Sequence, residues 1–121
     1  MSMYFQMGDR DLWNPGNRSG AMFVSLAEAM SPIVEKPTGL RAQEFDPGTI
    51  DVDIEQFRAF TVALADAYGT TQNMVYRRMV ETILAICLVI TERAGVSVEI
   101  ETRGPSGLGD RVAELTRAMA R

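Results

Sequence analysis

A run of consecutive apolar residues, Ile83–Ile90, constrains the fold more than any other segment of this sequence. It lies inside a longer stretch that begins after Thr70 and Thr71, either of which is suited to cap a helix, and that ends near Gly95. The first half of this stretch is amphipathic, but the second half is apolar on every side. Because a helix of that kind lies at the buried centre of a fold, we expect the rest of the chain to surround it.

Three further helices are predicted around this central one. Apolar residues recur at spacings of three and four after Asn17, and Pro32 is expected to kink or split that first helix. A second helix is predicted to begin at Asp53, where Gln56 three residues further on fits a capping box. Asp110 is suited to cap a last, short helix.

Two short strands complete the predicted elements. Residues 3–7 form one, and the polar–apolar alternation of residues 96–102 predicts another that could pair with it. The turn-forming residues of segment 38–50 indicate an irregular connection. The expected fold class is therefore mainly α, a bundle of about four helices with a minor β-strand pair. We expect one helical domain over residues 1–121, in which residues 96–121 are a candidate strand–loop–helix extension.

Histidine is absent from all 121 residues. Its absence removes the usual general base near neutral pH and the commonest zinc ligand. A calcium loop at the acidic stretch Glu44–Glu55 is also disfavoured, because Gln56 stands where the EF-hand pattern requires glycine. The single cysteine, Cys87, lies in the apolar run and is expected to be an inert core residue. We therefore expect neither a metal nor a cofactor.

The charge balance favours some partners over others. With 16 acidic and 12 basic side chains the net charge is −4, which argues against nucleic acid and against an anionic membrane surface. The first residues lack the basic and apolar regions of a signal peptide, so we expect a cytoplasmic protein. An edge formed by Glu44, Asp46 and Asp51 is a candidate binding surface for a basic protein partner, although a solvated acidic edge is the plainer interpretation.

The aromatic residues near the start of the chain form the most distinctive local cluster: Tyr4, Phe5 and Trp13, with Asn14 and Arg18 close by. One interpretation is a staple that seals one end of the helical bundle. The other is a binding site, either one wall of a small-molecule pocket or a hot spot for a protein partner.

Glu81 is the one candidate for acid–base chemistry. It precedes the wholly apolar part of the central helix and lies four residues after Arg77, so an ion pair along the helix is the plainer interpretation. If it faces the interior instead, it becomes a candidate catalytic acid or base. Tyr68 and Tyr76 are then the nearest candidate helpers in the sequence.

With these residues in view, the chain resembles a family of small actinobacterial proteins of unknown function. The resemblance rests on Tyr4-Phe5, Gly8-Asp9 and Leu12-Trp13-Asn14-Pro15, and it continues through Pro37-Thr38-Gly39-Leu40 and an apolar helix that contains Glu81. It covers most of residues 3–95, whereas residues 96–121 look like an extension. The resemblance supports an origin and a compartment, and it implies no catalytic residues.

Three hypotheses of function follow. The leading one is a non-enzymatic protein-binding module, such as an immunity-type or accessory protein that masks a partner. The second is a small cofactor-free enzyme or ligand carrier, acting on a secondary metabolite in a hydrophobic pocket that the chain's eight methionines are suited to line. The third is a structural homodimer, joined through the last helix. The partner is thus expected to be a protein or a second copy of the chain, and a small-molecule ligand is the alternative.

Overall fold

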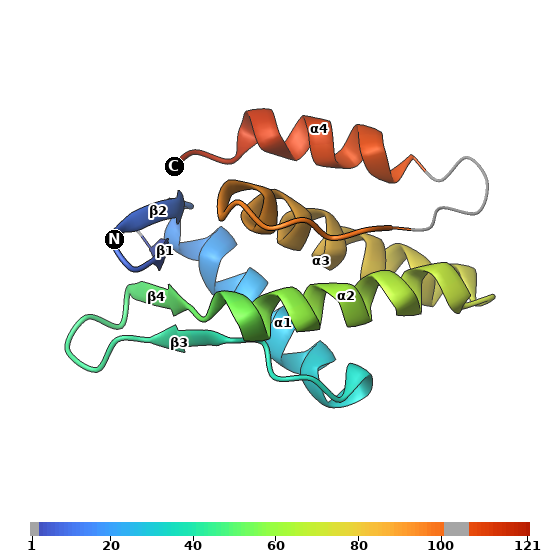
Figure 1. Cartoon of the computed structure of the whole chain (residues 1–121), viewed down its shortest axis with the longest axis horizontal. Coiled ribbons are helices and arrows are strands. Elements are labelled where there is room, and N and C mark those ends of the chain that lie inside the picture. Colours follow the sequence, from blue (N-terminus) through green and yellow to red (C-terminus); the bar gives the residue numbers. More distant parts are fainter. Residues whose placement is uncertain (1–2, 101–106) are drawn as a thin grey trace.

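The computed structural model describes residues 3–100 and 107–121 of the chain, and Figure 1 shows their arrangement. In chain order the elements are β1 (Tyr4–Met7), β2 (Arg10–Trp13), α1 (Asn17–Val34), β3 (Leu40–Ala42), β4 (Thr49–Val52), α2 (Ile54–Thr70), α3 (Met74–Arg93) and α4 (Leu108–Ala118). The fold is α+β. The predicted mainly α bundle with a minor strand pair is wrong, because a mixed four-stranded sheet accompanies the helices.

The sheet has the strand order β2-β1-β4-β3. Strand β1 pairs antiparallel with β2 and parallel with β4, and β3 pairs antiparallel with β4. Segment 38–50, predicted to be irregular, therefore contains β3 and the start of β4. Each of these strands is only three or four residues long, so the turn formers Asp46-Pro47-Gly48 between them dominate the sequence pattern.

The strand predicted over residues 96–102 is not formed at residues 96–100, and its last two residues lie outside the described part of the chain. The alternation of apolar and polar residues does predict which side chains are half-buried. Val96, Val98 and Ile100 are half-buried, whereas Ser97 and Glu99 are exposed. This segment lines a shallow hollow together with residues of α3. It does not pair with β1, whose two neighbours in the sheet are β2 and β4.

The helix boundaries follow local hydrogen bonding. Asp53 caps α2 as predicted, because its side chain accepts a hydrogen bond from the backbone N–H of Gln56 at 3.2 Å. The cap of α3 is Asn73 rather than a threonine, and its side chain accepts from the N–H of Tyr76 at 3.0 Å. Helix α1 continues through Pro32 and ends two residues later, so the predicted split is wrong. A proline in the last turn removes one backbone hydrogen bond and leaves the preceding turns intact.

Helix α3 is the buried centre of the fold, as the apolar run predicts. Between Ile83 and Ile90 every residue except Ile86 is buried. This helix contacts α1, α2, α4 and β2. Three aromatic rings join the sheet to α1: Phe5 stacks on Trp13 with ring centroids 5.1 Å apart, and both rings pack in an edge-to-face arrangement with Phe23.

A glycine fixes the path of the chain from α1 into β3. Gly39 has a φ of +75°, and a Cβ atom added there would lie 2.7 Å from the carbonyl oxygen of Asp53. The close approach of the two backbone segments allows a hydrogen bond, in which the N–H of Asp53 donates to the carbonyl of Gly39 at 2.8 Å. Both the conformation and the space at this position require glycine.

Candidate functional site

Two adjoining cavities lie between α1, α3 and α4. One, of about 530 Å³, lies against Trp13 and the start of α1, and the other, of about 430 Å³, reaches Glu81. Thr82, Ile86 and Leu115 line both of them. The two cavities therefore form one continuous groove, which we call the α1/α4 groove after the two helices that form its walls.

Helix α3 forms the floor of this groove. Val75, Met79, Thr82 and Ile86 follow spacings of four, three and four, which places them on one face of the helix. Val75 is 71% exposed and Met79 is 64% exposed, and Met22 on the α1 wall is 65% exposed. Single exposed apolar residues are ordinary, but Met22 lines the groove, and Val75 and Met79 lie on the α3 face that forms its floor. The helical face that forms the floor of the groove thus also carries exposed apolar side chains.

The other end of the groove is closed by β2 and by the last residues of the chain. The N–H of Asn14 donates to the carbonyl of Ala120 at 2.8 Å, and Trp13 is only 6% exposed. In Figure 1 the C-terminus and β2 lie at the same end of the molecule. This contact joins two segments from opposite ends of the sequence, and no local pattern predicts it.

Arg93, at the end of α3, holds the α4 wall in place. Its Nη1 donates to the carbonyl of Leu12 at 2.9 Å, and its Nη2 donates to the carbonyls of Thr116 at 3.1 Å and Met119 at 2.6 Å. Burial of the guanidinium lowers the pKa of Arg93. The same side chain therefore ties β2, α3 and α4 together.

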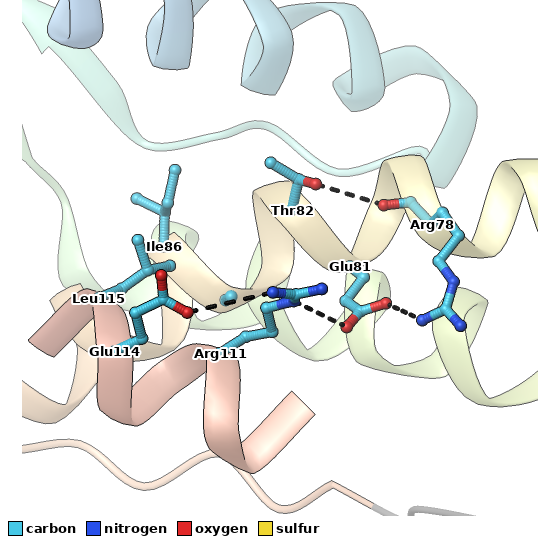
Figure 2. Close-up of a pocket in the computed structure, with 8 residues that line it drawn as sticks. Arg78, Glu81, Thr82, Ile86, Arg111, Glu114 and Leu115 are labelled. Atoms are coloured by element: carbon cyan, nitrogen blue, oxygen red, sulfur yellow. Dashed lines mark hydrogen bonds and ion pairs between the residues drawn. The ribbon is translucent and has the colours of Figure 1, made fainter. Parts of the chain in front are cut away.

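The polar end of the groove is built around Glu81, which Figure 2 shows between two arginines. The Glu81 side chain is 6% exposed, and one of its oxygens accepts a hydrogen bond from Nη1 of Arg78 at 2.9 Å. Its other oxygen lies 3.9 Å from Nε of Arg111 on α4. Arg111 also approaches Glu114, with 4.0 Å between Nη1 and Oε2. Sequence analysis missed both arginines, and only the spacing of Arg78 three residues before Glu81 could have indicated one of them.

A model of a protein family, described as a family of unknown function (DUF6086), matches residues 1–121. The chain belongs to this family. The expected relation to a family of unknown function is confirmed, whereas the actinobacterial origin that the resemblance implied stays a prediction. No curated protein and no solved structure matches this DUF6086 chain. Among its described residues, no helix is long and apolar enough to cross a membrane.

The candidate helpers of Glu81 lie elsewhere in the DUF6086 fold. Tyr68 is buried in the core, and the guanidinium of Arg77 lies 4.5 Å above the centre of its ring. Arg77 is therefore engaged with this ring, and the predicted pair between Arg77 and Glu81 is replaced by the pair with Arg78. Tyr76 lines a separate hollow with residues of α1 and α2. The three residues proposed for acid–base chemistry do not share one site.

The aromatic cluster is divided between the core and the groove. Phe5 is fully buried and Tyr4 is 43% exposed, so neither lines the groove. Trp13 and Asn14 do line it, at its closed end. Arg18 is exposed on the first turn of α1. The structure thus places Trp13 and Asn14 at one end of the groove and the Glu81 carboxylate near the other.

The acidic edge lies on the β3–β4 hairpin, on the opposite side of the molecule from α4 in Figure 1. Asp46 accepts a hydrogen bond inside the hairpin turn, and Asp51 accepts one from Gln43 at 3.1 Å. Glu44 and Phe45 are exposed at the tip. In the described parts of the chain, no three Cys, Asp or Glu side chains gather as ligands for a metal ion. Two of the three carboxylates thus have hydrogen-bonding roles within the hairpin.

Proposed function

We propose that this protein is a non-enzymatic protein-binding module that holds part of a partner in the α1/α4 groove. One observation carries the proposal: the apolar groove reaches the exposed side chain of Met22, and the α3 face that forms its floor also carries the exposed side chains of Val75 and Met79. Exposed apolar surface of this kind marks interaction sites. Methionine is common on such surfaces because its flexible side chain adapts to the shape of a partner.

The contacts of Glu81 support binding over catalysis. One carboxylate oxygen is bonded to Arg78 and the other faces Arg111, while both arginines remain more than half exposed. A general base needs an accessible oxygen beside the substrate, whereas here the carboxylate orders two arginines at the rim of the groove. An accessory or immunity-type role, in which the groove covers a segment of the partner, fits this arrangement.

A capture experiment tests the proposal. Tagged protein is incubated in a lysate of its native host, washed at low salt, and the bound material is identified by mass spectrometry. The matched variants are Met22→Glu on the groove wall and Val62→Glu on α2, both at exposed apolar positions. We expect one stoichiometric protein with the natural chain and with Val62→Glu, and its loss with Met22→Glu. Equal recovery with all three would exclude the groove as the binding surface.

A ligand carrier is the second candidate, because Trp13 and Glu81 line adjoining parts of the same groove. A small apolar ligand would rest on Ile86 and Leu115 between them. Titration with anilinonaphthalene sulfonate, followed through the fluorescence of Trp13, would test it. Saturable one-to-one binding that Met22→Glu abolishes would favour the carrier, and the absence of saturation would count against it.

The homodimer hypothesis remains a prediction. Helix α4 packs against α3 of its own chain, so a second copy would meet its outer, exposed face. Light scattering over a range of concentrations measures the mass directly. A constant monomer mass would rule this hypothesis out.

A further inference from the structure

We infer that α4 (Leu108–Ala118) is a detachable strap, which leaves α3 and binds it again while the sheet, α1, α2 and α3 stay folded. Bound, the strap forms one wall of the α1/α4 groove and helps to bury Glu81. Detached, it exposes the face of α3 beneath it. The inference goes beyond the proposed function, because it concerns the chain alone and does not depend on a partner.

Helix α4 is the least buried of the described helices. Leu108 is its one buried residue, and Val112 and Leu115 are half-buried. Among the described elements it packs closely on α3 alone, whereas α1 packs on both α2 and α3. Figure 1 shows α4 at the outer edge of the molecule. Because segments with few buried apolar contacts open at a lower free energy than the core of a fold, the strap is expected to open before the rest of the chain.

The strap loses its helical structure when it detaches. It is 11 residues long, and isolated helices shorter than about 12–15 residues are marginal in water. Detachment therefore also breaks the hydrogen bonds within the helix and exposes the backbone N–H groups of residues 112–118 to water. The hydrogen exchange of these amides reports the opening of the strap directly.

Three hydrogen bonds form a latch at the C-terminal end of the strap. Arg93 donates to two carbonyls there, one through an exposed bond and one through a partly buried bond, and the N–H of Asn14 donates to the carbonyl of Ala120. Towards the other end, Nε of Arg111 lies 3.9 Å from the carboxylate of Glu81, which exceeds hydrogen-bond length. Detachment therefore requires the latch to break, and water can replace its exposed bond.

Opening uncovers a row of side chains on α3. Glu81, Ala85 and Leu88 are all buried, and they line a cavity or a hollow together with residues of α4. Their spacings of four and three place them on one face of the helix. With the strap detached, this row joins Thr82 and Ile86, which already form the floor of the groove. The open chain thus presents a wider apolar floor and an accessible carboxylate.

Native-state hydrogen exchange on the full chain tests the inference. Exchange is followed residue by residue by nuclear magnetic resonance, at urea concentrations below the unfolding transition. We expect the amides of residues 112–118 to be at least about 100-fold less protected than those of residues 83–90. Exchange in the strap should depend only weakly on urea because opening exposes little surface, whereas exchange in residues 83–90 should follow global unfolding.

Two variants distinguish opening of the strap from global unfolding. Val52 is buried in β4 and keeps its contacts in the open state, so Val52→Ala should speed exchange of residues 83–90 by at least about tenfold and leave the strap within about twofold. Leu115→Ala removes a contact of the strap itself, so it should speed exchange of residues 112–118 by about tenfold. Circular dichroism establishes that each variant is folded.

The outcomes separate this inference from the proposed function. Equal protection and equal urea dependence of the two sets of amides would show that α4 opens only with the whole fold, and the inference would be refuted. The same conclusion follows if Val52→Ala speeds exchange in both sets alike. These measurements need no partner, so their failure leaves the binding module standing, and a failed capture experiment leaves the strap standing.

Discussion

Replacing Arg93 by methionine should loosen α4 and open the groove at its closed end. Arg93→Met keeps much of the apolar stem and removes the guanidinium, whose hydrogen bonds reach the carbonyls of Leu12, Thr116 and Met119. The bonds to Leu12 and Met119 are partly buried, and the bond to Thr116 is exposed. Water can replace the exposed bond, but the other two carbonyls would lose their donor.

The expected loss follows from these contacts. Hydrogen bonds to charged groups contribute about 1.5–3 kcal/mol each, and exposed bonds contribute less. The net stabilisation that Arg93 provides is smaller than the sum of its hydrogen bonds, because burying the guanidinium costs free energy. Its Nε is buried without a hydrogen-bond partner in the described structure. We therefore expect Arg93→Met to lower the free energy of unfolding by about 2–4 kcal/mol. For a domain of this size that corresponds to a melting temperature lower by about 10 °C.

Urea unfolding followed by two probes measures this loss. Far-ultraviolet circular dichroism reports the helices, and the fluorescence of Trp13, the only tryptophan, reports the end of the groove next to Leu12. The control is Arg117→Met, which removes an exposed arginine from the last turn of α4 and should change stability by less than about 0.5 kcal/mol. A loss of less than about 0.5 kcal/mol in Arg93→Met, or an equal loss in the control, would refute the reasoning.

Four further predictions concern other parts of the fold. Gly39→Ala should lower the free energy of unfolding by about 3 kcal/mol, since a Cβ would lie 2.7 Å from the carbonyl oxygen of Asp53. Gly8 also has a positive φ but has open space around it, so Gly8→Ala should lower the free energy of unfolding by only about 1 kcal/mol. Similar losses for the two variants in urea unfolding would contradict this. Burial raises the pKa of the Cys87 thiol, so iodoacetamide at pH 8 should alkylate it only after unfolding, and rapid reaction of the folded chain would disprove the burial. Because the unfolded thiol titrates near 9.0 and the folded thiol stays neutral, the unfolding free energy should fall by about 1.4 kcal/mol per pH unit above that pH; the Cys87→Ala variant should lack this decrease, and parallel pH profiles would refute it. Phe45 is 94% exposed at the hairpin tip, so Phe45→Ser should change stability by less than about 0.5 kcal/mol, and a larger loss in thermal unfolding would show that this ring is packed.

Sequence patterns predicted the elements whose signals are local. The apolar run Ile83–Ile90 correctly predicted the buried centre, and Asp53 with Gln56 correctly predicted the start of α2. The sheet was underestimated because β3 and β4 are too short to show alternation. Segment 96–100 shows the converse: its alternation predicted which residues are half-buried, but a strand also needs a neighbour with free backbone groups.

The groove was beyond the reach of sequence analysis for a related reason. Glu81 and Trp13 were both selected as candidates, but their placement on one groove depends on Leu115, which α4 supplies from a distant part of the chain. Arg111 was not selected, because nothing in its neighbourhood indicates that it approaches Glu81. Local spacing predicts contacts within a helix, and contacts between helices follow from packing.

The contact between Asn14 and Ala120 has a consequence for synthesis of the chain. Translation from the N-terminus makes α1, α2 and α3 before the residues that form α4 and the closing bond, and the interval takes on the order of seconds at about 5–20 residues per second. During that time the floor at Ile86 and the donors of Arg93 have no covering helix. The groove is therefore complete only after the residues of α4 and the segment up to Ala120 have been synthesised and have left the ribosome.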